Sequence, residues 1–157
     1  MLNVRRAKSA DIADLTDILV LFHKYFKELN GETQRIHRAA VQREIQNLAF
    51  ESHPLLYIYV ATENEKVIGA VSFYRGWTTD ASLMYHIPYL FIRPEYRGSR
   101  ATFALLNHIS RLARKTNVRR LCFSVYGKNL PVKKLYEHIG AKYWADAEDE
   151  LFMFFDI

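Results

Sequence analysis

The 157-residue sequence has one cysteine, few glycines and prolines, and no long apolar run. The lone Cys122 excludes an intrachain disulfide and a cysteine-based metal site. Six glycines and four prolines exclude a collagen-like or low-complexity chain. The longest unbroken apolar stretch, Leu55–Ala61, has seven residues, whereas a membrane-spanning helix needs about 20. The opening residues MLNVRRAKSADIADL contain no apolar core, so we expect no signal peptide, no membrane partner and a cytoplasmic protein.

Material for a hydrophobic core is abundant, since half of the residues are hydrophobic and 14% are aromatic. A chain of this length corresponds to one domain, and we expect that domain to cover residues 1–157. The net charge of +5 is localised. From Arg93 to Arg120 there are eight basic residues and one acid, whereas the rest carries 14 basic and 16 acidic residues. Such a stretch indicates either an anionic partner, a phosphorylated ligand or nucleic acid, or a solvated helix face.

Hydrophobic periodicity and chain breakers predict the element order β-αα-βββ-α-β-α-ββ. Helices are expected from an N-cap at Ser9 to Asn30, from about Thr33 to before Pro54, over about 100–116, and from Pro131 to Gly140. Strands are expected at Asn3–Arg6, Leu55–Ala61, Val67–Arg75, Met84–Ile92, Val118–Val125, Ala141–Trp144 and Leu151–Ile157. This order favours an α/β fold of the α+β type, with a mixed, mostly antiparallel sheet of six to seven strands and four flanking helices.

A basic loop joins a predicted strand to a predicted helix in the segment LFIRPEYRGSRAT, residues 90–102. The first turn of a helix presents unpaired N–H groups and a partial positive charge, which suits phosphate. Gly98 lets the backbone approach an anion closely, and Arg97 and Arg100 offer guanidinium groups. The segment therefore predicts a diphosphate site made mainly of backbone, although an ordinary loop with two surface arginines is the alternative. It is neither a Walker loop nor a dinucleotide fingerprint.

Two phrases of the sequence resemble the GCN5-related N-acetyltransferase (GNAT) family. PEYRGSRATFALL is similar to that family's acetyl-coenzyme A loop, Arg/Gln-x-x-Gly-x-Gly/Ala before a helix, and NLPVKKLYEHIGAKYW is similar to its later motif. The element order matches the family over essentially the whole chain. Arg100 and Thr102 depart from the pattern, because the family usually has glycine or alanine there. Their side chains could crowd the cofactor or replace lost backbone contacts.

The resemblance implies a GNAT-like acyl-CoA N-acyltransferase fold and transfer of acetyl from acetyl-coenzyme A to a primary amine, by direct attack in a ternary complex. It implies a bulge at Pro88, where the missing N–H also predicts a locally unpaired strand. The implied cofactor-binding residues are Leu90, Phe91, Ile92, Arg97, Gly98, Ser99, Arg100, Ala101, Thr102, Asn129 and Tyr136.

Tyr136 matches the family tyrosine that donates a proton to the departing thiolate, and its position on an apolar helix stripe also fits a plain core residue. His86 is the candidate base, because it titrates near neutrality. A structural role explains His86 at least as well, and Tyr85, Tyr89 or a water chain are other candidate bases. The remaining histidines lack metal-ligand spacing, so we expect no metal. Cys122, between Leu121 and Phe123, is interpreted as a core thiol.

The resemblance places the amine acceptor near residues 22–51, 76–85 and 144–151. These segments contain the acids and aromatics Tyr25, Glu28, Glu32, Trp77, Asp80, Trp144, Asp146, Glu148, Asp149 and Glu150. Such residues suit a cationic group, and a solvated surface explains them as well. The acceptor could be a small molecule, a protein amine or an aminoacyl group. A coenzyme A-binding protein without transfer and a nucleic-acid-binding module using the Arg93–Arg120 patch are the competing classes. No aromatic stripe interleaves the patch, so nucleic acid is not expected. A homodimer is compatible with the sequence.

Overall fold

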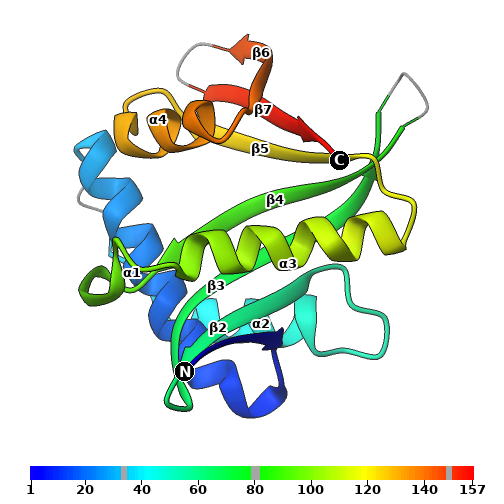
Figure 1. Cartoon of the computed structure of the whole chain (residues 1–157). Helices are drawn as coiled ribbons and strands as arrows, with labels where there is room; N and C mark the ends of the chain where they lie inside the picture. The colour runs from blue at the N-terminus through cyan, green and yellow to red at the C-terminus, as the bar shows by residue number, and fades with distance from the viewer. Residues whose placement is uncertain (33–34, 79–81, 148–149) are drawn as a thin grey trace. The chain divides into compact units, whose positions relative to one another are not determined.

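The computed structural model describes residues 1–32, 35–78, 82–147 and 150–157, and its helices and strands follow the expected order (Figure 1). The strands are β1 (Leu2–Arg6), β2 (Tyr57–Glu63), β3 (Lys66–Trp77), β4 (Leu83–Ile92), β5 (Arg120–Tyr126), β6 (Lys142–Ala147) and β7 (Glu150–Asp156). The α-helices are α1 (Ile12–Asn30), α2 (Arg38–Ala49), α3 (Ala101–Lys115) and α4 (Leu130–His138). Short 3-10 turns at Ser9–Asp11 (η1) and Pro94–Tyr96 (η2) precede α1 and α3.

The strands form one seven-stranded sheet in the order β1-β2-β3-β4-β5-β7-β6. β4 pairs with β5 in parallel, whereas β1 with β2, β5 with β7, and β6 with β7 pair antiparallel. The expected α/β class, with a mixed and mostly antiparallel sheet beside four helices, is confirmed.

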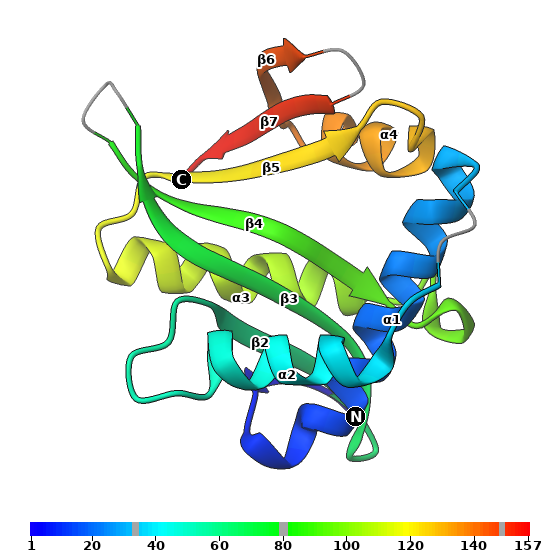
Figure 2. The ribbon, with the colours of Figure 1, turned by 180° about the vertical axis from the view of Figure 1, so that it is seen from behind.

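The chain forms two compact units, the first comprising residues 1–72 and 89–108 and the second residues 73–88 and 109–157. β3, β4 and α3 each run from one unit into the other. In the first unit, α1 and α2 lie on the same side of β2 (Figure 2) and bury apolar side chains against the sheet. This core comprises Leu15, Ile18, Val41, Ile45, Ile58, Val60, Val67, Ala70, Tyr89 and Phe91.

In the second unit, β5 pairs with β7 along its whole length, from Arg120 opposite Asp156 to Tyr126 opposite Glu150. α4 packs on this pair through Tyr136, whose ring contacts Phe123 and Phe155. Cys122 is buried and forms no disulfide, which agrees with its interpretation as a core thiol. The β6–β7 register shifts between Tyr143 and Ala145.

Several expected boundaries are wrong. The helix expected from about Thr33 begins at Arg38, because His37 before it is extended; Thr33 itself lies outside the described residues. Ser9 does not cap α1 but belongs to η1. The side chain of Asp11, not Ser9, accepts a backbone hydrogen bond there, from Lys8 N–H at 2.7 Å.

The strand boundaries shift by up to three residues. β3 continues to Trp77, two residues beyond its expected end at Arg75. A tight turn joins β2 to β3, and its two central residues, Asn64 and Glu65, have φ values of +48° and +68°. Paired positive φ angles match the right-handed twist of a two-residue hairpin.

Candidate active site

Arg93 anchors the stem of the predicted diphosphate loop to β3 and α1. Its backbone N–H donates to Ile68 O at 2.8 Å, and its Nε donates to Val67 O at 2.9 Å. Its guanidinium also pairs with Asp14 at 2.9 Å, and the side chain is only 12% exposed. Arg93 therefore stabilises the loop stem, and it is not part of an exposed basic patch.

The loop tip is open and has the backbone conformation that glycine allows. Gly98 has a φ of +77°, and a Cβ built on it would meet no atom within 4 Å. The left-handed conformation, rather than crowding, therefore demands glycine here. Arg97, Gly98, Ser99 and Arg100 are all exposed, and Ser99 Oγ accepts a hydrogen bond from Ala101 N–H at 3.3 Å.

The two departures from the family pattern leave the loop accessible. Arg100 is exposed and Thr102 is partly exposed, at the point where α3 begins. An arginine at this place adds a cation beside the helix N-terminus, which favours an anionic group. The loop residues therefore fit a diphosphate.

The last residues of β4 lead into this loop from a tightly packed position. Phe91 and Ile92 are each 6% exposed. A Cβ at Gly69 of β3 would lie 2.3 Å from Ile92 Cδ1 and 3.0 Å from Phe91 O, so only glycine lets β3 approach β4 here. The backbone of Leu90, Phe91 and Ile92 is thus held by its neighbours.

Arg97 makes a contact that the sequence did not predict. Its guanidinium carbon lies 5.1 Å from the ring centroids of both Tyr25 and Phe91. Tyr25 belongs to α1 and had been grouped with the acceptor residues. Because Tyr25 and Arg97 are 72 residues apart, no local pattern signals the contact.

Tyr136 lies in the second unit and is 6% exposed. Its ring centroid is 4.6 Å from that of Phe123 and 6.3 Å from that of Phe155. Burial raises the pKa of its phenol, which keeps the proton on the oxygen at neutral pH. That state suits a proton donor, and the same packing suits an ordinary core residue.

His86, also in the second unit, stands opposite Cys122 in the parallel register of β4 and β5. Its ring stacks on Tyr74 with centroids 4.9 Å apart. Burial lowers the pKa of His86, and the negative charge of Glu150 opposes this only in part. The imidazole is therefore neutral at pH 7, as a proton acceptor must be.

The other base candidates are less suitable. The hydroxyl of Tyr85 is hydrogen bonded to Thr116 Oγ1 at 2.7 Å. Burial raises the pKa of Tyr89, whose buried hydroxyl has no hydrogen-bond partner among the residues that the structure describes. A phenol that resists ionisation is a poor base.

Asn129 takes the N-cap position of α4, but its side chain makes no capping hydrogen bond. Its backbone carbonyl accepts a hydrogen bond from Lys133 N–H at 3.0 Å. The β4–β5 register extends to Ile87 opposite Phe123, one residue before Pro88, as expected for a proline that interrupts pairing.

The acceptor residues within the described part are mostly at the surface. Trp77 and Trp144 are 64% and 48% exposed, and Glu28, Glu32, Asp146 and Glu150 are also exposed. Asp80, Glu148 and Asp149 lie outside the described residues.

The predicted residues thus divide between the units: residues 90–102 are in the first, and His86, Asn129 and Tyr136 are in the second. The Arg93–Arg120 patch is interrupted at both ends, since Arg93 pairs with Asp14 and Arg120 with Asp156 at 3.1 Å. The part of the chain that the structure describes holds no group of three potential metal-ligating side chains. Its helices also lack the combined length and hydrophobicity that crossing a membrane requires.

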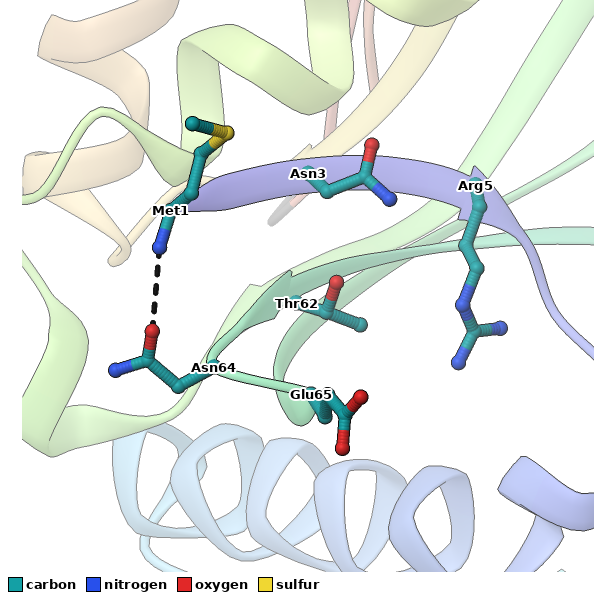
Figure 3. Close-up of a pocket in the computed structure, with 6 residues that line it drawn as sticks. All are labelled: Met1, Asn3, Arg5, Thr62, Asn64 and Glu65. Carbon is teal, nitrogen blue, oxygen red and sulfur yellow. Dashed lines mark hydrogen bonds between the residues drawn. The ribbon is translucent and has the colours of Figure 1, made fainter.

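A cavity of about 530 Å³ lies at the β1–β2 edge of the first unit (Figure 3). None of its lining residues is a predicted site residue: Met1, Asn3, Arg5, Thr62, Asn64 and Glu65. The Met1 ammonium donates to Asn64 Oδ1 at 3.2 Å, and Arg5 pairs with Asp11 at 2.7 Å.

Comparison with known proteins shows what this chain resembles. A search of curated protein sequences gives no match. Among solved structures, the chain is similar to an acetyltransferase from Thermus thermophilus, with a TM-score of 0.78 and 20% identity over 100% of this chain and 97% of that one. It is also similar to the PaiA N-acetyltransferase from Thermoplasma acidophilum in complex with coenzyme A, with a TM-score of 0.77 and 14% identity over 100% and 99%.

A plant protein, Arabidopsis thaliana NAA60 in complex with a bisubstrate analogue, gives a TM-score of 0.74 and 14% identity over 100% of this chain and 98% of that one. At these identities the solved structures establish the fold. The model of the acetyltransferase (GNAT) family matches residues 17–141, which is most of the chain. The protein therefore belongs to the GNAT acetyltransferase family.

Proposed function

We propose that this protein, acting as one domain, is an N-acetyltransferase that moves an acetyl group from acetyl-coenzyme A to a primary amine, by direct attack within a ternary complex. Family membership supports acyl transfer in general. The observation that carries the cofactor assignment is the loop tip, where Gly98 at φ +77° and the exposed Arg97 and Arg100 precede α3. Backbone and side chains there offer what a diphosphate needs.

Each predicted cofactor residue has a distinct task in this proposal. The backbone of Leu90, Phe91 and Ile92 would pair with the pantetheine arm, as a strand pairs with an added strand. The amides of residues 98–102 and the two guanidiniums would hold the diphosphate. Acetyl-coenzyme A would supply the activated acyl group when bound, and Asn129 would contact its arm.

Two titratable groups of the chain would transfer protons in this reaction, one as a base and one as an acid. An alkylamine is mostly protonated at pH 7, so a base must free its lone pair, and the neutral, partly buried His86 is our candidate. The phenol of Tyr136, kept protonated by burial, would donate a proton to the thiolate that leaves. No covalent intermediate with the protein is needed.

Two structural relatives support the substrate classes. The Thermoplasma protein was solved with coenzyme A and the Arabidopsis protein with a bisubstrate analogue. For this chain, the amine could be a small molecule, a protein amine or an aminoacyl group. The exposed tryptophans and acids of the second unit (Trp77, Trp144, Asp146 and Glu150) would suit a cationic acceptor.

The test has two stages. Thermal shift with coenzyme A should raise the melting temperature of the protein, and release of free thiol from acetyl-coenzyme A should accelerate with some members of an amine panel. Stabilisation without thiol release from any amine would instead support a coenzyme A-binding protein without activity.

Nucleic-acid binding is the competing function, and the ion pairs of Arg93 and Arg120 weaken it. Stabilisation by DNA or RNA that disappears at high salt, with no response to coenzyme A, would overturn the proposal in favour of that function.

A further inference from the structure

The guanidinium of Arg97 lies against two aromatic rings of the first unit. Its central carbon is 5.1 Å from the centroid of Tyr25 and 5.1 Å from that of Phe91. The two rings are 6.4 Å apart and inclined at 51° to each other. Both distances fall within the range of favourable cation–π contacts.

Neither ring is fully exposed, and Phe91 packs against a further aromatic ring. Phe91 is 6% exposed, and its ring meets the edge of Phe22 of α1 at 6.0 Å with an interplanar angle of 80°. Tyr25 is partly buried one helical turn further along α1. Arg97 itself is exposed, so its long side chain would sample many rotamers without this contact.

The charge of Arg97 is not neutralised by a carboxylate within the described residues, since every ion pair found there involves other cations. Arg93, four residues earlier, contrasts with it, because Asp14 and Val67 O occupy its guanidinium. Among the described residues, no acceptor takes a hydrogen bond from the Arg97 side chain, so its N–H groups are available for phosphate oxygens.

We propose that Tyr25 is a positioning residue for cofactor binding: with Phe91, it holds the Arg97 guanidinium in place for the diphosphate. This inference rests on the proposed function. Tyr25, which the sequence grouped with the acceptor residues, thereby gains a role in cofactor binding that it exerts by positioning Arg97. Pre-ordering a flexible side chain raises affinity because less freedom is lost on binding.

The expected effects follow from the proposal that the Tyr25 ring aids cofactor binding by positioning Arg97. Tyr25→Leu should weaken coenzyme A binding about three- to fivefold. Tyr25→Phe and Tyr25→Trp keep an aromatic face and should bind within about twofold of the wild type. In the Arg97→Met background, Tyr25→Leu should have no further effect, because the group that the ring positions is gone.

The experiment is calorimetric titration of the full chain with coenzyme A. It uses wild type, Tyr25→Leu, Tyr25→Phe, Tyr25→Trp, Arg97→Met and the double variant Tyr25→Leu/Arg97→Met. Phe26→Leu is the matched control, since Phe26 is an exposed aromatic next to Tyr25 on α1 and stacks on Phe22 rather than on Arg97. Its affinity should equal that of the wild type.

The outcomes separate the two proposals. The positioning role is supported if the wild type binds coenzyme A, Tyr25→Leu binds it more weakly, and Tyr25→Phe and Tyr25→Trp bind it as the wild type does. In the Arg97→Met background, Tyr25→Leu must then cause no further loss of affinity. Wild-type binding with additive losses, or with equal losses for Phe26→Leu, overturns the role and leaves the proposed function standing. Absence of wild-type binding overturns both. If Tyr25→Leu fails to fold, Tyr25→Trp and Tyr25→Met replace it. Wild-type affinity in Tyr25→Trp with weaker binding in Tyr25→Met supports the positioning role, and wild-type affinity in both variants overturns it.

Discussion

The two parts of the candidate site rest on different kinds of evidence. In the first unit, the loop of residues 93–102 is defined by backbone: Arg93 bonds to β3, and Gly98 adopts a left-handed conformation. In the second unit, Tyr136 and His86 are defined by side-chain chemistry, because burial raises the pKa of one and lowers that of the other. The left-handed conformation of Gly98 explains why glycine is needed at that position, whereas a buried tyrosine fits both a core and a catalytic role.

The largest expected effect tests whether Tyr136 of the second unit is a proton donor or a core residue. Tyr136→Phe should lower turnover about 100-fold, because the proton donor is lost. The ring contacts with Phe123 and Phe155 are kept, so coenzyme A affinity and melting temperature should change little. Tyr143→Phe, which removes an exposed phenol of the same unit, is the control and should retain wild-type turnover. Equal turnover in both variants would make Tyr136 a plain core residue.

The next effect concerns the loop stem. Arg93→Met should lower the free energy of unfolding by about 2 kcal/mol, because Asp14 and Val67 O lose a charged hydrogen-bond donor in a mostly buried place. Arg114→Met, at an exposed position on α3, should change it by less than about 0.5 kcal/mol. Urea denaturation measures both. Similar values for the two variants would return Arg93 to the exposed basic patch.

Gly98 at the loop tip can be compared with Gly140, which follows the end of α4 and also has a positive φ. Gly98 and Gly140 have φ values of +77° and +91°, and neither would place a Cβ within 4 Å of another atom. Alanine at either position should cost about 1 kcal/mol of stability through backbone strain. Only Gly98→Ala should also weaken coenzyme A binding, by about tenfold in calorimetry. An equal affinity for both variants would contradict the loop assignment.

The smallest effect tests the base. Burial lowers the pKa of His86 below its usual 6.5, so the imidazole is neutral at pH 7 and becomes charged as the pH falls through the lowered value. Wild-type kcat/KM should therefore fall on the acid side of that pKa. His86→Asn should lower kcat/KM at pH 7.5, by less than Tyr136→Phe lowers turnover, and should flatten the acid limb, because the titrating group is gone.

An exposed histidine serves as the control for this profile. His53→Asn should retain both the activity and the acid limb. An acid limb that persists in His86→Asn would show that another group accepts the proton.

Local patterns in the sequence were enough for the element order and for the loop. Gly31 and Gly140 end their helices where expected, and the strand–loop–helix segment takes the predicted form. Element ends were less accurate, because pairing partners decide them: β3 extends to Trp77 beyond the apolar run.

Contacts distant in sequence were beyond any local pattern. Arg93 and Asp14 are 79 residues apart, and Arg120 and Asp156 are 36 apart. A run of basic residues therefore looked like one patch although acids elsewhere neutralise its ends. The contact of Tyr25 with Arg97 was hidden for the same reason, because only the folded chain brings α1 to the loop.

The bonds of Arg93 and the packing at Gly69 have a consequence for protein engineering. The loop takes its position from β3, through Ile68 O, Val67 O and the space that the missing side chain of Gly69 leaves for Ile92. A transplant of residues 90–102 alone into another scaffold would lose that support. A transplant would have to include at least residues 66–70 and the turn of α1 that carries Asp14.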